Sequence, residues 1–150
     1  MGSLYVFDLD GTLARNEWRS FLIKQDPPDW YEYHEASKYD VPYQPMVELA
    51  CSLAWNTGNY VELWTARPKA HREVTLGWLS RWDIPFDRLL MRADGDRRRA
   101  HLVKLDWLHE AAQQWYDNIM VWEDSTNTVK AMQEHGLDRA MICQVNHRED

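Results

Sequence analysis

Two aspartates, one residue apart, stand at the end of the first apolar run of the chain. The run over residues 4–9 contains Asp8, Asp10 follows it, and Gly11 breaks the pattern. An apolar run that ends at a turn residue indicates a buried strand, and open α/β sheets bind ligands at the C-terminal ends of their strands. One carboxylate of such a pair can attack phosphorus, while the other protonates the leaving oxygen and then activates water. We interpret the pair as the reacting groups of a phosphoryl-transfer site; the alternative is two solvated acids in a strand-end turn.

A second pair of acids follows another apolar run. Residues 119–122 form that run, and Glu123 and Asp124 come directly after it. Adjacent carboxylates at a strand end can bind a metal directly or through water, and Mg²⁺ prefers carboxylate, carbonyl and phosphate oxygens. The sequence therefore predicts a Mg²⁺ site at the two pairs of acids, Asp8 with Asp10 and Glu123 with Asp124. The alternative is that Asp124 only caps the following helix.

Hydroxyl and cationic side chains that can bind phosphate stand elsewhere in the chain. Thr65 and Arg67 follow the apolar run 60–64, and Lys104 lies between apolar neighbours in a predicted helix. A hydroxyl can bond one phosphate oxygen, and a guanidinium can hold two oxygens at once. From the residues alone, each of the three could equally be an ordinary strand-end or solvated helix residue.

The apolar runs alternate with helical patterns, which predicts a mainly parallel five-stranded sheet with helices on both faces. Pro45 suits a first helical turn and Gly58 a helix end. The expected strands are residues 4–9, 60–64, 88–91, 119–122 and 140–143, and the expected helices are residues 45–56, 69–82, 98–116 and 126–135.

Residues 14–44 are of a different kind. They are rich in aromatic residues and proline and have no helical or strand period. A segment of this length next to a candidate site is typical of a functional loop or a small cap. The alternative is an irregular excursion that only packs on the core.

The composition indicates one α/β domain over residues 1–150. The 150 residues are enough for one core, and no apolar run approaches the roughly 20 residues of a membrane span. The start of the chain does not have the pattern of a signal peptide, and the two cysteines have no metal-ligand spacing, so we expect a cytoplasmic protein. A net charge of −7 argues against a generic nucleic-acid binder, but it is compatible with an enzyme that binds one phosphate in a local basic pocket.

The segment FDLDGTL resembles motif I of the haloacid-dehalogenase (HAD) superfamily of phosphotransferases. The resemblance implies that Asp8 is the nucleophile and Asp10 the general acid and base. Thr65 and Arg67 are similar to motif II, and Lys104 to the motif III lysine that offsets the charge of nucleophile and phosphate. Glu123 and Asp124 are similar to motif IV, which more often reads Asp-Asp, so the acid that contacts the metal directly is left open.

The resemblance is closer to one branch, the 3′-phosphatase domain of phage polynucleotide kinase/phosphatase. FDLDGTLA followed by Arg19, and LMRADGDRR leading to Lys104, occur there in the same order. This similarity implies that Arg19 and Arg67 bind the substrate, with Arg15 a less favoured stand-in for Arg19. Arg97 either reaches the substrate as well or only orders the turn.

This likeness implies a magnesium-dependent phosphomonoesterase that acts through an aspartyl-phosphate and removes 3′-phosphates from polynucleotide or nucleotide ends. No P-loop pattern occurs, so we expect a phosphatase without the kinase half. The alternative in the same class is a phosphatase of free nucleoside monophosphates, including 5′-monophosphates. The alternative from another class is a non-catalytic nucleotide-binding module. The oligomeric state is left open.

Overall fold

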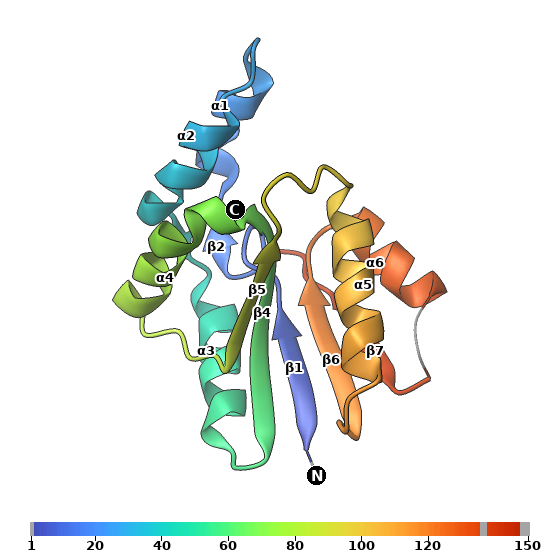
Figure 1. Cartoon of the computed structure of the whole chain (residues 1–150). Helices are drawn as coiled ribbons and strands as arrows, with labels where there is room; N and C mark the ends of the chain where they lie inside the picture. Colours follow the sequence, from blue (N-terminus) through green and yellow to red (C-terminus); the bar gives the residue numbers. More distant parts are fainter. Residues whose placement is uncertain (1, 136–137, 148–150) are drawn as a thin grey trace.

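A parallel sheet forms the centre of the computed structural model, which describes residues 2–135 and 138–147 (Figure 1). Its strand order is β5-β4-β1-β6-β7, and every neighbouring pair is parallel. The predicted five-stranded α/β architecture is therefore confirmed. The strands are β1 (Ser3–Phe7), β4 (Asn59–Pro68), β5 (Arg88–Arg92), β6 (Asn118–Glu123) and β7 (Ala140–Gln144).

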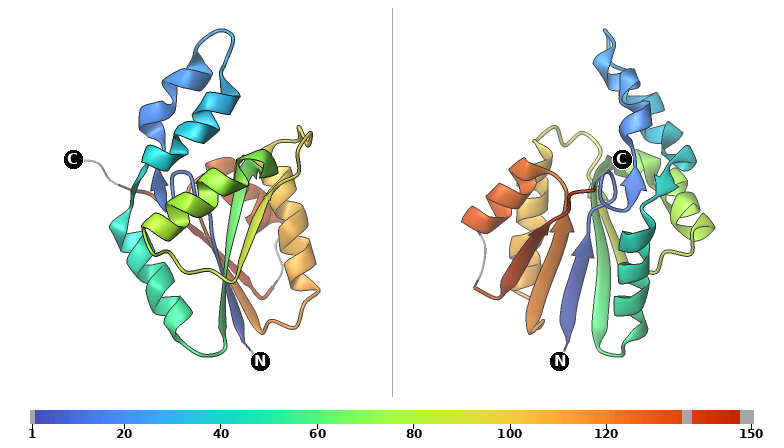
Figure 2. Two further views of the ribbon diagram at one scale, coloured as in Figure 1. Left: turned by 60° about the vertical axis from the view of Figure 1, so that its left-hand side comes forward. Right: turned by 180° about the vertical axis from the view of Figure 1, so that it is seen from behind.

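Helices cover both faces of the sheet (Figure 2). Successive residues of β1 serve opposite faces, because side chains alternate along a strand: Val6 packs in one core and Phe7 in the other. One core includes α3 (Gln44–Trp55) and α4 (Arg72–Arg81), and the other includes α5 (Ala100–Ala112) and α6 (Thr126–Glu134). With both faces covered, the central strands are apolar along their length.

Three elements differ in length from the expectation. β4 continues to Pro68, with a register shift against β5 after Thr65, so Thr65 and Arg67 belong to the strand itself. The segment predicted as one helix over 69–82 begins with a 3₁₀ turn, η3 (Lys69–His71), before α4. α5 is shorter than the predicted 98–116. Asp96 holds the backbone N–H of Arg98 (3.0 Å) outside the helix, and i→i+3 bonds close its other end.

The predicted cap is a chain excursion from the C-terminal edge of the sheet. Its base is a two-stranded antiparallel ribbon of β2 (Ala14–Arg15) and β3 (Val41–Pro42). Between these strands the chain forms four short helical pieces, two of which project from the body (Figure 1). None of these pieces exceeds six residues, which explains why the sequence shows no period there. They are η1 (Glu17–Arg19), α1 (Phe21–Lys24), α2 (Trp30–Glu35) and η2 (Ala36–Tyr39).

The parallel sheet brings distant motifs to one edge. Phe7, the last residue of β1, pairs with Leu63 of β4 on one side and with Trp122 of β6 on the other. The residues that follow, Asp8 and Glu123 among them, therefore emerge side by side. Among the described residues, no helix combines the length and the apolar character that a bilayer crossing needs, and the cytoplasmic location stays a prediction.

Candidate active site

Three carboxylates meet where β1 and β6 end. Asp8, Glu123 and Asp124 each offer an oxygen, and these oxygens lie within 4.8 Å of one another. The backbone N–H of Asp8 donates to the carbonyl of Trp122 (3.0 Å), so the sheet ladder continues to the first of these acids. Asp8 and Glu123 are buried, and Asp124 is half-buried.

Lys104 of α5 joins two of the three acids. Its Nζ donates to Asp8 Oδ1 and to Glu123 Oε2, both at 2.6 Å. Burial alone would lower the pKa of Lys104, but Asp8 and Glu123 outweigh it and raise that pKa. The helix turns this lysine inward because Val103 and Leu108 share its buried side. The charged residue predicted between apolar neighbours is thus a buried cation at the acid cluster.

One ammonium leaves the cluster with an excess of negative charge. Burial and the Asp8 carboxylate raise the pKa of both Glu123 and Asp124. The atoms that these three acids offer to a metal ion are all oxygens. Thr12 Oγ1 lies within hydrogen-bonding distance of Asp8 Oδ2 (3.2 Å) and Asp124 Oδ1 (3.4 Å). A hard divalent cation fits this arrangement, because oxygen donors suit Mg²⁺ and its charge offsets the excess.

The two acids of motif IV have different surroundings. Glu123 is occupied at both oxygens, by Lys104 and by the backbone N–H of Ser125 (3.1 Å). Asp124 has no cation beside it among the described residues; Thr12 Oγ1 lies 3.4 Å from its Oδ1, and the Asp8 carboxylate is its other polar neighbour. Gly11 packs against that carboxylate at φ +84°, and a Cβ added there would overlap it. The geometry thus distinguishes a fixed Glu123 from an Asp124 that can turn toward a cation.

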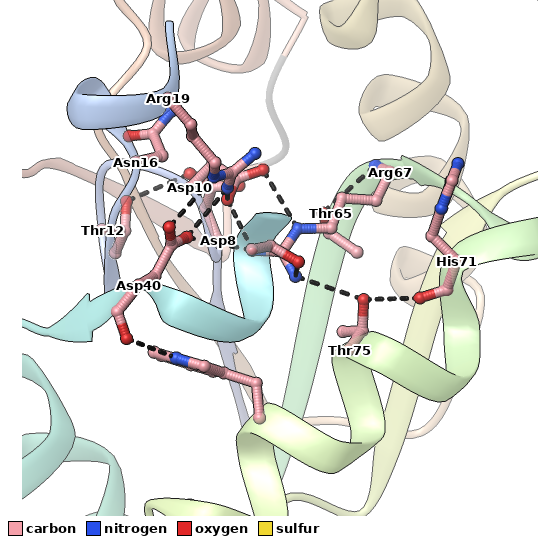
Figure 3. A network of polar contacts seen from close by, with 12 residues as sticks. Asp8, Asp10, Thr12, Asn16, Arg19, Asp40, Thr65, Arg67, His71 and Thr75 are labelled. Carbon is pink, nitrogen blue, oxygen red and sulfur yellow. Dashed lines mark hydrogen bonds and ion pairs between the residues drawn. The ribbon is translucent and has the colours of Figure 1, made fainter. Parts of the chain in front are cut away.

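A second charged group surrounds Asp10 (Figure 3). Arg67 donates to it from Nε (3.1 Å to Oδ2) and Nη2 (2.6 Å to Oδ1), and Arg19 Nη2 donates to Oδ1 at 2.7 Å. Burial would raise the pKa of Asp10, but Arg67 and then Arg19 outweigh it, so the pKa lies well below its usual range. Asp10 therefore turns its carboxylate away from the acid cluster and is ionised in the free protein.

Both guanidinium groups are fully buried and held from behind. Arg19 is bound by the Asp40 carboxylate (3.0 and 2.8 Å) and by the carbonyl of Tyr33 (2.8 Å). Arg67 Nη1 lies 3.3 Å from Ser37 Oγ and 3.2 Å from Thr75 Oγ1. Bidentate charge-assisted contacts of this kind fix the plane of an arginine.

Asp40 is itself fixed by two indoles. Trp18 Nε1 donates to its Oδ1 and Trp78 Nε1 to its main-chain carbonyl, each at 2.8 Å. Trp18 and Asp40 belong to the cap, whereas Trp78 belongs to α4. The network around Asp10 therefore spans cap and core.

The family model of the polynucleotide kinase PNKP phosphatase domain, a HAD family, matches residues 3–149. The chain belongs to this family. Among solved structures, a chain of the Pnkp1/Rnl/Hen1 complex is 26% identical with a TM-score of 0.80, and it covers 100% of this chain and 48% of its own length. The chain thus spans about half the length of that protein. A search of curated proteins gives no significant match.

More distant structures share the fold. A putative β-phosphoglucomutase from Thermotoga maritima is 20% identical with a TM-score of 0.63, covering 100% of this chain and 88% of its own. A HAD family enzyme from Bacteroides thetaiotaomicron, solved with magnesium and inorganic phosphate, is 12% identical with a TM-score of 0.57, covering 100% and 97%. At these identities the likeness concerns the HAD fold alone.

Three further residues predicted from the sequence of this HAD phosphatase domain, Thr65, Arg15 and Arg97, have other surroundings than the residues described above. Thr65 is buried, and its Oγ1 accepts the backbone N–H of Arg67 (3.2 Å), which shapes the strand end. Arg15 lies 4.3 Å from the centre of the Tyr43 ring, whereas Arg19 makes the contacts to Asp10. Arg97 is exposed and makes no hydrogen bond or ion pair with the described residues.

The turn around Arg97 is ordered by its neighbours. Asp96 pairs with Arg98 (2.9 Å), and the guanidinium of Arg92 donates to the carbonyls of Ala66, Asp96 and Arg98. Asp96 therefore orders the turn through Arg98.

Several polar residues of these networks are not predicted from the sequence. Thr12 stands inside FDLDGTL, so its place in the motif is a signal that points to it. Asp40 and Ser37 lie in the aperiodic cap, and Thr75 lies in an ordinary amphipathic helix, where no pattern marks them.

Replacing Gly11 by alanine tests the packing of the acid cluster. In Gly11→Ala the new Cβ would displace the Asp124 carboxylate, so we expect phosphatase activity to fall about 100-fold, as misplaced catalytic groups do. The thermal stabilisation of the wild-type protein by Mg²⁺ should also be lost, because a ligand stabilises only the state that binds it. Hydrolysis of p-nitrophenyl phosphate and melting curves with and without Mg²⁺ measure both effects.

Gly95→Ala is the matched control. Gly95 has nearly the same backbone angle (φ +83°), but no atom lies near the added Cβ. Both variants carry about 1–2 kcal/mol of backbone strain, so equal losses of activity in the two would contradict the role of Asp124 packing.

Proposed function

We propose that the chain is a magnesium-dependent phosphomonoesterase that acts through an aspartyl-phosphate on Asp8. The observation that carries the proposal is the pairing of two charged groups at one sheet edge. One is the Asp8–Lys104–Glu123 cluster beside Asp124, and the other is Asp10 held by two arginines. Membership of a phosphatase family supports the same reaction class.

In the first step, a carboxylate oxygen of Asp8 attacks phosphorus, and the bond from phosphorus to the ester oxygen breaks. Lys104 fixes Oδ1 of Asp8 and Thr12 lies at Oδ2, so the nucleophile approaches in a set orientation. The leaving oxygen takes a proton from Asp10. In the second step, Asp10 removes a proton from water, and the water oxygen attacks phosphorus, so phosphate is released and Asp8 is regenerated.

Asp10 must be protonated before it can act as an acid. Its contacts with Arg19 and Arg67 keep it ionised in the free protein. A phosphate dianion would compete for the same guanidinium donors and draw them away, which raises the pKa of Asp10 as the substrate binds. This competition gives Arg19 and Arg67 two roles, substrate binding and control of the Asp10 proton, while Thr65 holds the strand end next to them.

Mg²⁺ would be held by Asp8, by Asp124, and by the main-chain carbonyl of Asp10, with Glu123 acting through Lys104 and through water. When bound, it neutralises charge on the phosphate oxygens and on the attacking carboxylate. Asp124 is the better direct ligand of the two acids, because both oxygens of Glu123 are already bonded. We also propose that residues 1–150 act as one phosphatase domain in which residues 14–44 are the cap.

As substrate we propose a 3′-phosphate on a polynucleotide or nucleotide end. The support is the family itself and the structural likeness to a chain of an RNA repair complex. A phosphatase of free nucleoside monophosphates is the second candidate, favoured by the net charge of −7, because free nucleotides need no extended basic surface.

A matched set of substrates tests this choice. Phosphate release is measured with Mg²⁺ on a 3′-phosphorylated oligonucleotide, its 5′-phosphorylated counterpart, and free 3′- and 5′-mononucleotides. We expect the highest kcat/KM for the 3′-phosphorylated oligonucleotide. A clear preference for free 5′-mononucleotides would favour the second candidate, a phosphatase of free nucleoside monophosphates. Asp8→Asn should abolish activity in either case.

The leaving group reveals the role of Asp10. A nucleoside 3′-phosphate has a poor leaving group that needs a proton, whereas p-nitrophenyl phosphate does not. Asp10→Asn should therefore lower kcat/KM, which reports only the steps up to departure of the leaving group, about 100-fold or more on the nucleotide, and at least tenfold less on the aryl ester. Asp8→Asn should abolish both reactions alike. Equal losses on the two substrates in Asp10→Asn would show that Asp10 is not the general acid.

A further inference from the structure

Three successive arginines on the loop between β5 and α5 differ in their surroundings. Arg98 is held between two carboxylates, Asp96 (2.9 Å) and Asp106 (2.7 Å). Arg97 and Arg99 on either side of it are exposed and form no ion pair with the described residues. The middle arginine therefore anchors the loop, and the outer two present their charges to solvent.

The loop is also fixed at its other end. Asp94 Oδ1 accepts the backbone N–H of Ala70 in η3 (2.9 Å), and Arg92 binds the carbonyl of Ala66 (2.9 Å). Ala66 lies next to Thr65 at the end of β4, and Ala70 lies in the turn that directly follows this strand. Arg97 and Arg99 thus stand on a preorganised segment beside that site.

A groove of about 340 Å³ lies between α5 and α6, and Arg99 is part of its lining. Its lining carries the charges of Arg99 and Lys130, with two histidines, and Glu134 is the only acid among the described residues that line it. Leu102 and Leu105 of α5 and Ala131 of α6 contribute its apolar lining. The full lining is Arg99, His101, Leu102, Leu105, Asn127, Lys130, Ala131, Glu134 and His135.

The groove begins at the active-site edge of the sheet. α6 starts at Thr126, two residues after Asp124, and α5 turns Lys104 into the site while the adjacent Leu105 lines the groove. The helices lie side by side in both figures, and contact each other along their packed faces. At about 1.5 Å per residue, α6 is roughly 13 Å long, about the axial length of four stacked nucleotides.

The charge distribution favours this side of the site over the cap. The tip of the cap carries three exposed acids, Asp26, Asp29 and Glu32, against the one exposed cation Lys24. A phosphate backbone leaving the site would be repelled there and attracted toward the loop and the groove. This matters because the net charge of the chain is −7, so a strand can bind only where cations are concentrated locally.

We propose that the groove between α5 and α6 binds the sugar–phosphate backbone of a single-stranded polynucleotide upstream of its 3′-phosphate, through Arg99 and Lys130, with Arg97 at its entrance. The inference rests on the proposed function and narrows its substrate to a strand of several nucleotides. Arg97 then binds a phosphate next to the one that is cleaved, which agrees with its place outside the charged groups at Asp8 and Asp10.

The test compares a twelve-nucleotide 3′-phosphorylated strand with a nucleoside 3′-phosphate in wild type and in Arg99→Glu/Lys130→Glu. We expect the ratio of the two kcat/KM values to fall about tenfold in the variant at low salt, because only the longer substrate reaches the groove. The slope of log kcat/KM for the strand against log salt should become shallower by about 1.4, or 0.7 for each lost phosphate contact.

Arg81→Glu/Arg88→Glu is the matched control. It reverses two exposed cations away from both the groove and the cap, and changes the net charge by the same amount. Its substrate ratio should equal that of wild type within about twofold. Melting curves check that both variants fold, and Arg99→Gln/Lys130→Gln, with a smaller expected effect in the same direction, replaces the charge reversal if that variant does not fold.

The outcomes separate this inference from the proposed function. A wild-type enzyme that prefers the strand, with an unchanged ratio and salt slope in Arg99→Glu/Lys130→Glu, overturns the groove as the binding site of the strand and leaves the proposed function standing. Equal effects in the control variant overturn it as well, because general charge would explain them. A wild-type enzyme that does not prefer the strand contradicts the polynucleotide substrate itself.

Discussion

The buried negative charge at one sheet edge is the constraint on which this structure depends. Asp8, Asp10, Asp40, Glu123 and Asp124 all lie near the ends of β1 and β6 or directly over them, where water cannot solvate them fully. Burying a carboxylate without a partner costs several kcal/mol, so each must be bonded or neutralised. The chain divides the task between two cationic groups, Lys104 for the nucleophile side and an arginine pair for Asp10.

The two groups differ in how complete they are. The arginine side is closed: Arg19 and Arg67 are matched by Asp10 and Asp40, and their remaining donors find oxygens of the cap and α4. The lysine side has one cation for three carboxylates and retains an excess of negative charge. This asymmetry makes the lysine side the place for a divalent cation, and a cation bound there would attract the phosphate group that the two arginines also bind.

The cap is part of this electrostatic arrangement. It supplies Arg19, Ser37 and Asp40 to the network of Asp10, and Glu35 of α2 contacts His71 Nδ1 of the core at 2.7 Å. Movement of the cap would therefore break ion pairs that control the Asp10 carboxylate. Cap position and the proton affinity of Asp10 are linked through Arg19.

The sequence predicts the parts that follow from local patterns. Apolar runs locate the strands, and their parallel order brings Asp8, Thr65 and Glu123 to one edge before any coordinates are seen. Lys104 is predictable only through the family motif, since its inward turn depends on how α5 packs. The short cap helices and Asp40 cannot be predicted, because four- and six-residue helices have no measurable period and the partner of Arg19 lies 21 residues away. The role of Arg98 is equally unpredictable, because the sequence does not show which of three adjacent arginines forms ion pairs with Asp96 and Asp106.

Trapping the covalent intermediate tests the central claim most directly. Borohydride reduces an acyl phosphate to an alcohol, so an enzyme quenched during turnover with Mg²⁺ and substrate should contain homoserine in place of Asp8, detectable in the peptide that carries residue 8. We expect this change only when substrate and Mg²⁺ are both present, and at no other acid. Reduction at Asp10 or Asp124, or full turnover with no modified peptide, would contradict Asp8 as the nucleophile.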